Sequence, residues 1–477
     1  MNFRTKSYLR KRFGDYYNSS ELPLPHDFKR REWGFIFFDE LPEVVMRRHK
    51  AFSSEGEAIE YLRGMVPAHV YHSAAYYQFP GAGTMKEKKW EGADLIFDLD
   101  ADHLPQKVRS YSEMLANVKA ETGKLLDFLL EDFGFDEENI RVAFSGGRGY
   151  HIHVHDPRVL TLESAQRRDI VDYIGGVGVD KDFMFRDYSI GKQFEMYIEG
   201  TKGTTHERRI KVGGGTTKRI VTFENIPGGY GWGKRVSQYL IQFLRNISMK
   251  DNTDANNEIS NILMNYYLKE VSTDEMQEDI VKQIIQLKKD KLLLEEIVHN
   301  VRVPIEKVRK ILITNDLWNF KQDATKKLNI LLKISQSSEA LDLIKNKGIV
   351  DFKGVPEFFE IILQNTIEEF GIKLGAKTDE PVTADIRRLI RMPSSLHGGS
   401  GMRVVPLTLA GFKEFEPLRD AVVFSEKEIN IEVIPPLKPQ NALVEMKGKS
   451  IKVVEGINIV PEYAGIYLMC RGAAEYA

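Results

Sequence analysis

Two stretches decide the fold: ADLIFDLDAD at residues 93–102 and RVAFSGGRGYHIHVHD at residues 141–156. The first carries the apolar run and alternation of a strand, and the second contains two strand-like runs on either side of a glycine turn. Side chains at positions i and i+2 of a strand point to the same face. Asp98 and Asp100 are therefore expected side by side, with Leu99 turned the other way into a core.

This pair of carboxylates indicates a metal site. Two carboxylates on one face repel each other, and neither can be buried in its ionised form without a partner. Mg²⁺ and Mn²⁺ prefer oxygen ligands, and two such ions about 4 Å apart stabilise both the attacking and the leaving oxygen of phosphoryl transfer. A D-x-D pattern alone is equally typical of a strand end, where Asp caps a turn. The preceding apolar strand and the elements downstream favour the metal interpretation.

The glycine turn indicates a phosphate site. Ser145, Arg148 and His151 surround three glycines, which let the backbone approach a phosphate and form an anion nest. Arg148 can hold a triphosphate through two hydrogen bonds, and His151 can donate to a phosphate oxygen. The alternative is a plain hairpin turn with a surface arginine. A zinc site at His151, His153 and His155 is disfavoured because no cysteine lies nearby, so His153 and His155 are expected in the core or in solvent.

A third candidate segment is KTDEPVTADIRRLIRMPSSLHGGSGMRV at residues 377–404. Asp379 can supply a third carboxylate to the metal pair from a different strand, while Arg391 and His397 can meet nucleotide sugar or phosphate. Taken alone, this segment is better described as a charged surface loop.

Hydrophobic periodicity predicts an α+β protein in which a mixed core is split by a helical insertion. The hairpin expected at residues 208–223 is closed by Gly213–Gly215, and a helix-turn-helix is one interpretation of residues 294–318, although ordinary helical packing is favoured. The tail has short strand-like runs after a proline-containing linker. The four expected segments are the first part of the core, the helical insertion, the second part of the core and a C-terminal extension: 1–234, 235–371, 372–424 and 425–477.

Composition excludes several classes of protein. The chain of 477 residues is 42% hydrophobic and 29% charged, and no apolar run approaches the roughly 18 residues that cross a bilayer. The N-terminus has no apolar signal region, so a cytoplasmic protein without a membrane partner is expected. Cys470 is the one cysteine, which excludes an internal disulfide, a cysteine-based zinc knuckle and an iron–sulfur cluster in this chain.

The net charge of −2 conceals basic stretches at residues 1–50, 205–219 and 381–403. Such stretches in a near-neutral protein are compatible with a polyanion held in a groove. Each of them taken singly is also compatible with ordinary solvated surface.

Together these motifs resemble the catalytic small subunit of archaeal and eukaryotic-type DNA primases. Five stretches occur in the order of that family and span residues 31–424: REWGF with MRRHKAF, FDLDADHL, SGGRGYHIHV, DEPVT followed by L-x-R-x-P-x-S-L-H-G, and FEPLRDAVVF. The combination is specific, whereas any single stretch is not.

The resemblance implies a discontinuous catalytic core with an RRM-like half and a helical subdomain. It implies synthesis of short RNA primers from NTPs on single-stranded DNA for the replicative polymerases, with a large subunit that carries an iron–sulfur domain. By position, the metal-binding aspartates are Asp98, Asp100 and Asp379. The implied contacts to the nucleotide, NTP or dNTP, are Ser145, Arg148, His151, Arg48, Lys377, Arg391 and His397.

One departure concerns zinc. Many members carry a Cys/His knuckle shortly after the D-x-D strand, and HLPQKVRSYSEML has none, so no structural zinc is expected. Three alternatives remain open from sequence: a repair-type or mobile-element polymerase of the same superfamily, a non-catalytic nucleic-acid-binding subunit, and a metal-dependent phosphodiesterase.

Overall fold

The computed structural model divides the chain into two compact units, Met1–Gly175 with Ile372–Ala477 and Gly176–Gly371. The structure describes residues 1–101, 110–179, 184–189, 195–198, 208–211, 217–221, 231–270, 278–315, 321–350, 352, 355–371, 382–436, 438 and 442–477.

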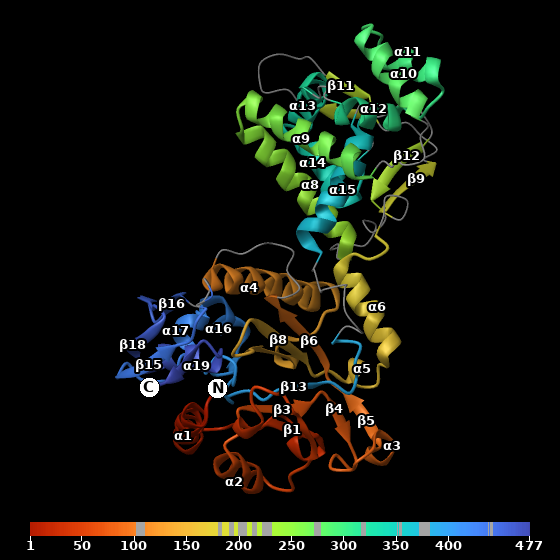
Figure 1. Cartoon of the computed structure of the whole chain (residues 1–477). Coiled ribbons are helices and arrows are strands. Elements are labelled where there is room, and N and C mark those ends of the chain that lie inside the picture. Colours follow the sequence, from red (N-terminus) through yellow and green to blue (C-terminus); the bar gives the residue numbers. More distant parts are fainter. Residues whose placement is uncertain are drawn as a thin grey trace, which may run out of the picture. The chain divides into compact units, whose positions relative to one another are not determined.

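The first unit contains mixed helices and strands (Figure 1). Up to Gly175 its main elements are α1 (Phe3–Ser19), β1 (Trp33–Ile36), β2 (Arg47–Lys50), α2 (Glu55–Met65), β3 (His69–Ser73), β4 (Ala75–Tyr77), α3 (Met85–Lys88), β5 (Trp90–Ala93), β6 (Leu95–Asp100), α4 (Tyr111–Asp127), β7 (Ile140–Phe144), β8 (Gly149–Val154), α5 (Pro157–Leu160) and α6 (Ser164–Gly175). After the insertion they are β13 (Leu389–Arg391), β14 (Val405–Leu407), α16 (Leu409–Glu414), α17 (Pro417–Asp420), β15 (Glu428–Val433), β16 (Leu443–Met446), β17 (Lys449–Lys452), β18 (Gly456–Pro461), α19 (Glu462–Cys470) and β19 (Ala474–Tyr476).

Two four-stranded antiparallel sheets form the core of this unit. Their strand orders are β13-β3-β1-β2 and β14-β7-β8-β6, so the late segment, residues 382–407, adds one edge strand to each sheet. The discontinuous core expected from sequence is confirmed by these two pairings. In the second sheet β8 lies between β6 and β7. Helix α4 follows β6 and precedes β7 in the chain, and this arrangement is the RRM-like half.

A buried charge network joins the two sheets. Arg31, two residues before β1, reaches Asp94, directly before β6, with 2.6 Å between nitrogen and oxygen, and their side chains are 2% and 4% exposed. Asp94 also accepts a hydrogen bond from the Tyr76 hydroxyl at 2.7 Å and pairs with His155 Nδ1 at 2.8 Å. Because each buried charge has a partner, the network fixes the corner at which the two sheets meet.

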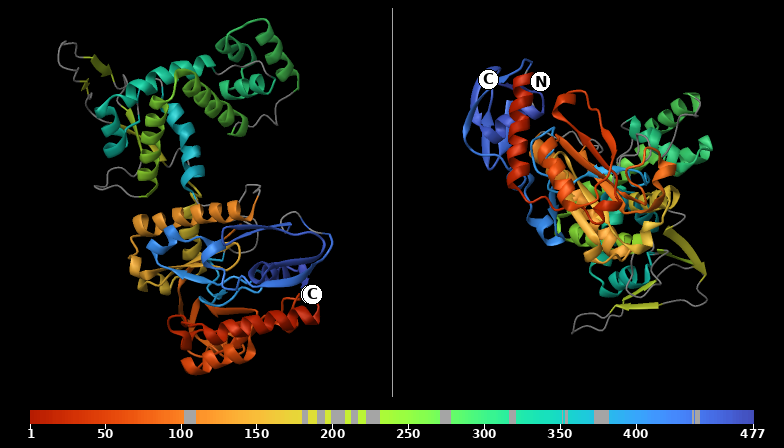
Figure 2. Two further views of the ribbon diagram at one scale, coloured as in Figure 1. Left: turned by 90° about the vertical axis from the view of Figure 1, so that its left-hand side faces the viewer. Right: turned by 90° about the horizontal axis from the view of Figure 1, so that it is seen from below.

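The C-terminal extension packs against the N-terminal helix, as the views of Figure 2 show. Its strands form the sheet β18-β15-β19, and its helix α19 is buried from Glu462 to Met469. The rings of Tyr8 and Tyr476 stack with centroids 4.0 Å apart. Arg12 on α1 forms an ion pair of 2.7 Å with the buried Glu462. The extension is therefore an integral part of the first unit.

The second unit is largely helical, as periodicity predicted for residues 235–371. Its described elements are β9 (Phe185–Ser189), β10 (Glu195–Ile198), β11 (Arg208–Lys211), β12 (Thr217–Val221), α8 (Gly231–Met249), α9 (Asn252–Glu270), α10 (Glu278–Lys289), α11 (Leu294–Val301), α12 (Ile305–Thr314), α13 (Lys321–Ser335), α14 (Ser338–Lys347) and α15 (Pro356–Phe370). Helices α10, α11 and α12 pack on one apolar core that includes Ile297 and Leu312. This unit begins at Gly176, whereas the sequence analysis places residues 176–234 in the catalytic core. That assignment stays a prediction.

The prediction of a hairpin at residues 208–223 is wrong. Strand β11 pairs with β10, and β12 pairs with β9, in two separate two-stranded sheets. A glycine-rich turn signal reports the geometry of a chain reversal, but it does not select the strand with which each arm pairs. The expected turn residues Gly213–Gly215 lie outside the described residues. Across the described part of the chain, no helix combines the length and apolarity that a membrane span requires.

The charge network predicts a pH dependence of stability. The hydrogen bond to Asp94 raises the pKa of His155 above its ordinary value. A raised pKa in the folded state means that His155 stabilises the fold at low pH and that this contribution is lost as pH rises through the folded pKa. We expect His155→Gln to lower the free energy of unfolding at about pH 5.5 by no more than about 1 kcal/mol and to have a smaller effect at about pH 9. Urea titrations at both pH values measure the difference.

The matched control is His299→Gln, because His299 is exposed at the end of α11. A cost of His155→Gln that is constant with pH, or that grows toward alkaline pH, would contradict the assignment of the pair.

Candidate active site

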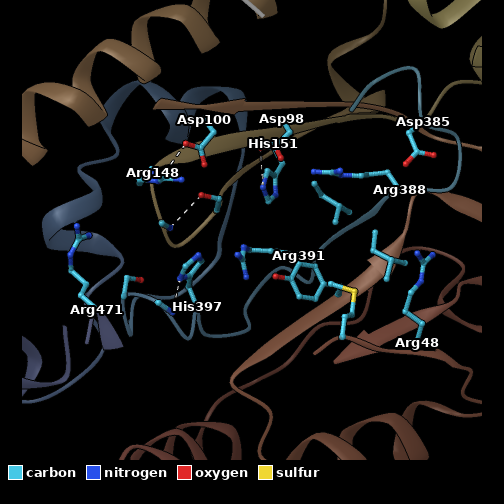
Figure 3. A pocket seen from close by; sticks show the side chains of 18 of the residues that line it. Arg48, Asp98, Asp100, Arg148, His151, Asp385, Arg388, Arg391, His397 and Arg471 are labelled. Carbon is cyan, nitrogen blue, oxygen red and sulfur yellow. Dashed lines mark hydrogen bonds and ion pairs between the residues drawn. The ribbon is translucent and has the colours of Figure 1, made fainter. Parts of the chain in front are cut away.

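A cavity of about 750 Å³ opens in the first unit, and it is lined by both sheets, the glycine turn, the late segment and the C-terminal extension (Figure 3). Its described lining carries seven basic side chains against three carboxylates. These are Arg48, Arg148, Arg387, Arg388, Arg391, Lys438 and Arg471 against Asp98, Asp100 and Asp385. A concave site with such an excess of positive charge attracts a polyanionic ligand.

The two carboxylates of β6 lie at this cavity, as the strand pattern predicted. Asp98 and Asp100 are 22% and 30% exposed, while Leu99 between them is buried. Asp98 faces its cross-strand neighbour His151, with 3.5 Å between a carboxylate oxygen and Nε2. Asp100 lies 3.5 Å from Nε of Arg148. The carboxylates therefore stand directly beside the glycine turn that carries the expected phosphate contacts.

The glycine turn is held in one shape by hydrogen bonds. The Ser145 hydroxyl accepts the N–H groups of Gly147 at 3.3 Å and Gly149 at 3.2 Å. The Tyr111 hydroxyl donates to the carbonyl oxygen of Gly147. A Cβ atom at Gly149 would collide with the backbone carbonyl of Leu99 on the neighbouring strand, so only glycine fits there. Ser145 thus shapes the turn, and its contact with a triphosphate stays a prediction.

His151 is a neutral group in this site. Burial lowers its pKa to about 3, and the nearby charges of Arg391 and Arg388 act in the same direction. Its Nδ1 atom is buried without a hydrogen-bond partner among the described residues. A neutral imidazole carries one N–H, so His151 can donate one hydrogen bond and accept another near neutral pH. His153 is half-buried, and the burial of its ring lowers its pKa to about 3 as well.

Arg391 and His397 come together from the late segment. Arg391 Nη1 lies 2.6 Å from Nδ1 of His69, and its guanidinium lies 5.0 Å from the centroid of the Tyr71 ring. The backbone N–H of Gly398 donates to the same His69 nitrogen. Burial holds the pKa of His397 well below its usual value, and the charge of Arg391 adds to the shift. His69 therefore orients an arginine at the centre of the cavity (Figure 3).

Arg48 is oriented from behind by a buried carboxylate. Glu32 receives two hydrogen bonds from the guanidinium, at 3.0 and 3.2 Å, and pairs with Lys88 at 3.1 Å. The side chains of Glu32 and Lys88 are fully buried. Burial alone would raise the pKa of Glu32, but Arg48 and Lys88 lower it overall. Glu32 therefore stays ionised and holds the arginine at the edge of the cavity.

The expected site residues fall into two groups. Asp98, Asp100, Ser145, Arg148, His151, Arg48, Arg391 and His397 all line the cavity. Asp379 and Lys377 lie outside the described residues. Among the residues that the structure describes, no group of three or more His, Cys, Asp or Glu side chains is arranged to hold a metal. The carboxylate oxygens of Asp98 and Asp100 do match the ligand preference of Mg²⁺ and Mn²⁺.

Sequence reasoning missed several residues of the cavity wall. Tyr71, Tyr111, Asp385, Lys438 and Arg471 line it as well. The basic stretch at residues 381–403 signalled the charge around Asp385, but the other four have no local motif. Arg471 in particular belongs to the tail beyond the recognised stretches.

Comparisons with known proteins identify a family for this chain. The model of a family described as "DNA primase small subunit" matches residues 97–409. The "DNA primase small subunit PriS" of Methanosarcina mazei is 42% identical over 100% of this chain and 98% of its own length. The proteins of the same name from Methanocella arvoryzae and Methanococcoides burtonii are 41% and 42% identical over the full length of both chains.

The buried pair behind Arg48 predicts a large cost when one partner is removed. Glu32→Gln leaves Lys88 buried without a counter-charge, which typically lowers the free energy of unfolding by about 3–5 kcal/mol. The double variant Glu32→Gln/Lys88→Met removes both charges and is expected to recover most of that loss. Denaturant titration of the single and double variants measures both effects.

Glu91→Gln is the matched control, because Glu91 forms a solvent-exposed ion pair with Arg30. The Arg30 side chain is 46% exposed and the Glu91 side chain 39%. Its expected cost is about 0–1 kcal/mol. A Glu32→Gln variant as stable as this control would show that the buried charges need no pairing.

Proposed function

The chain belongs to the DNA primase small subunit family, and we propose that its cavity carries out the templated nucleotidyl transfer that starts a new strand on single-stranded DNA. In this reaction a 3′-hydroxyl attacks the α-phosphate of an incoming nucleotide, and pyrophosphate leaves. One observation supports the proposal above the others. Two carboxylates on one strand face lie in the same cavity as a phosphate-type glycine turn and a large excess of positive charge.

We assign the metal site to Asp98, Asp100 and Asp379. Mg²⁺ or Mn²⁺, when bound by such a set, stabilises the charge on the attacking and leaving oxygens. The partial exposure of Asp98 and Asp100 leaves carboxylate surface facing the cavity. The place of Asp379 rests on its position in the family pattern.

The triphosphate is assigned to the glycine turn. The hydrogen-bonded turn places Arg148 in the cavity wall, and its planar guanidinium suits a phosphate. His151, neutral because its pKa is about 3, can donate its single N–H to a phosphate oxygen without adding a positive charge beside the metal carboxylates. Ser145 holds the shape of the turn from inside.

The remaining assigned contacts to the nucleotide are Arg48, Lys377, Arg391 and His397. Arg391 and Arg48 are both held in place by other side chains, His69 and Glu32 respectively. Groups that are oriented before the ligand arrives lose less entropy on binding. Arg391 and Arg48 are therefore expected to lose less entropy when a nucleotide binds.

The partners of this activity are proposed from the family. They are a primase large subunit, the single-stranded DNA template, NTPs or dNTPs, and the replicative polymerase machinery. We place the activity in the cytoplasm, as expected for an archaeal-type cell.

The metal assignment predicts a loss of activity on removal of one carboxylate. Asp98→Ala and Asp100→Ala should each reduce primer synthesis at least about 10²–10³-fold, because part of the transition-state stabilisation is lost. The assay uses the purified chain, labelled NTP or dNTP, single-stranded DNA, and Mg²⁺ or Mn²⁺. Asp39→Ala is the control, since Asp39 is 78% exposed.

Near-full primer synthesis by Asp98→Ala or Asp100→Ala would overturn the assignment. The same assay with and without a pre-made primer separates initiation from extension. Product formed only when a primer is supplied would favour a repair-type polymerase over a primase.

A further inference from the structure

The C-terminal extension reaches the cavity through Lys438 and Arg471. The family match ends at residue 409, and none of the assigned contacts lies beyond His397. Arg471 nevertheless lines the cavity, where it stands on the same side as Arg148 and His397 (Figure 3). A segment beyond the residues matched by the family model therefore contributes a cation to the proposed nucleotide site.

The backbone around Arg471 is fixed. Helix α19, buried along its length, ends at Cys470, and the N–H of Arg471 donates to the carbonyl of Tyr467 at 3.1 Å. The N–H of Gly472 donates to the carbonyl of Met469 at 3.0 Å. Three residues later β19 pairs with β15. The backbone that carries Arg471 is therefore held in place on both sides. A cation at a helix C-terminus is also favoured by the helix dipole.

Helix α19 also supports the loop that carries His397. A Cβ atom at Gly401, whose φ is +73°, would stand 2.6 Å from a methyl group of Ile466. The loop after His397 therefore packs backbone against helix. The frame that positions Arg471 is the same frame that positions an assigned nucleotide contact.

The side chain of Arg471 lies beside two neighbouring aromatic rings, Tyr467 and Tyr111, near the glycine turn. Its guanidinium is 5.2 Å from the ring centroid of Tyr467 and 5.8 Å from that of Tyr111. The hydroxyl of Tyr111 in turn donates to the carbonyl of Gly147. Arginine keeps a planar fork of donors when it lies over aromatic rings, and that fork suits phosphate. Arg471 is therefore directed to the end of the cavity where the triphosphate is assigned.

We propose that Arg471 binds the triphosphate of the incoming nucleotide together with Arg148, so that the C-terminal extension forms part of the nucleotide site. This inference rests on the proposed function, because it assigns a further contact in the same site. The extension thus supplies one phosphate-binding side chain, Arg471, to the cavity.

The test is equilibrium binding of ATP and AMP, in the presence of Mg²⁺, to full-length Arg471→Ala and Arg471→Lys. A lost hydrogen bond between charged groups weakens ATP binding about 10–100-fold. We expect Arg471→Ala to show this loss, Arg471→Lys to show a smaller one, and AMP binding to stay unchanged in both. In primer extension, KM for NTP should rise while kcat changes little.

The matched control is Arg419→Ala, because Arg419 is a half-exposed arginine on α17 that does not line the cavity. Arg471→Met keeps the apolar contact with the two tyrosine rings, so it keeps the test decisive if Arg471→Ala loses thermal stability. ATP binding by Arg471→Met equal to that of the unmodified chain, or an equal loss of ATP and AMP binding, would overturn the proposal.

Failure of the proposed function has a different signature. It would appear as primer synthesis retained by Asp98→Ala, whatever the Arg471 variants do. The ATP and AMP comparison requires no turnover, so it tests the contact made by Arg471 separately from the reaction.

Discussion

The buried ion pair between Arg31 and Asp94 sets the frame on which the cavity depends. Both charges are almost completely removed from water, which is costly unless each finds a partner at close range. Arg31 directs its other N–H groups to the carbonyls of Ser73 and Ala74, so it also fixes the end of β3. Since Asp94 opens the strand of the paired aspartates, the first sheet is tied to the carboxylate strand at one corner. Both sheets that line the cavity start from that corner.

Local pattern was sufficient for the centre of the site. The strand with Asp98 and Asp100 and the glycine turn after Phe144 were predicted because period-two alternation and turn glycines are properties of neighbouring residues. Pairing between distant strands has no such signal, which is why the hairpin at residues 208–223 was predicted wrongly.

The supporting side chains were missed for the same reason. Glu32 lies 16 residues before Arg48, and Arg471 is separated by hundreds of residues from the turn that it faces. Neither belongs to a recognisable motif. The family resemblance supplied Arg48 by position, but it carried no information on the tail, and α19 was not predicted at all. Residues that hold other residues in place become visible only when the backbone brings them together.

The split core has a consequence for folding during synthesis. Leu389 of β13 pairs with Ser73 of β3, about 300 residues earlier in the chain. At about 5–20 residues per second, a ribosome needs on the order of 15–60 seconds to make the intervening chain. Throughout that interval the edge of β3 has no strand to pair with, and an open edge invites association with other chains. The nascent chain therefore exposes this strand edge until β13, which lies in the last fifth of the sequence, has been made.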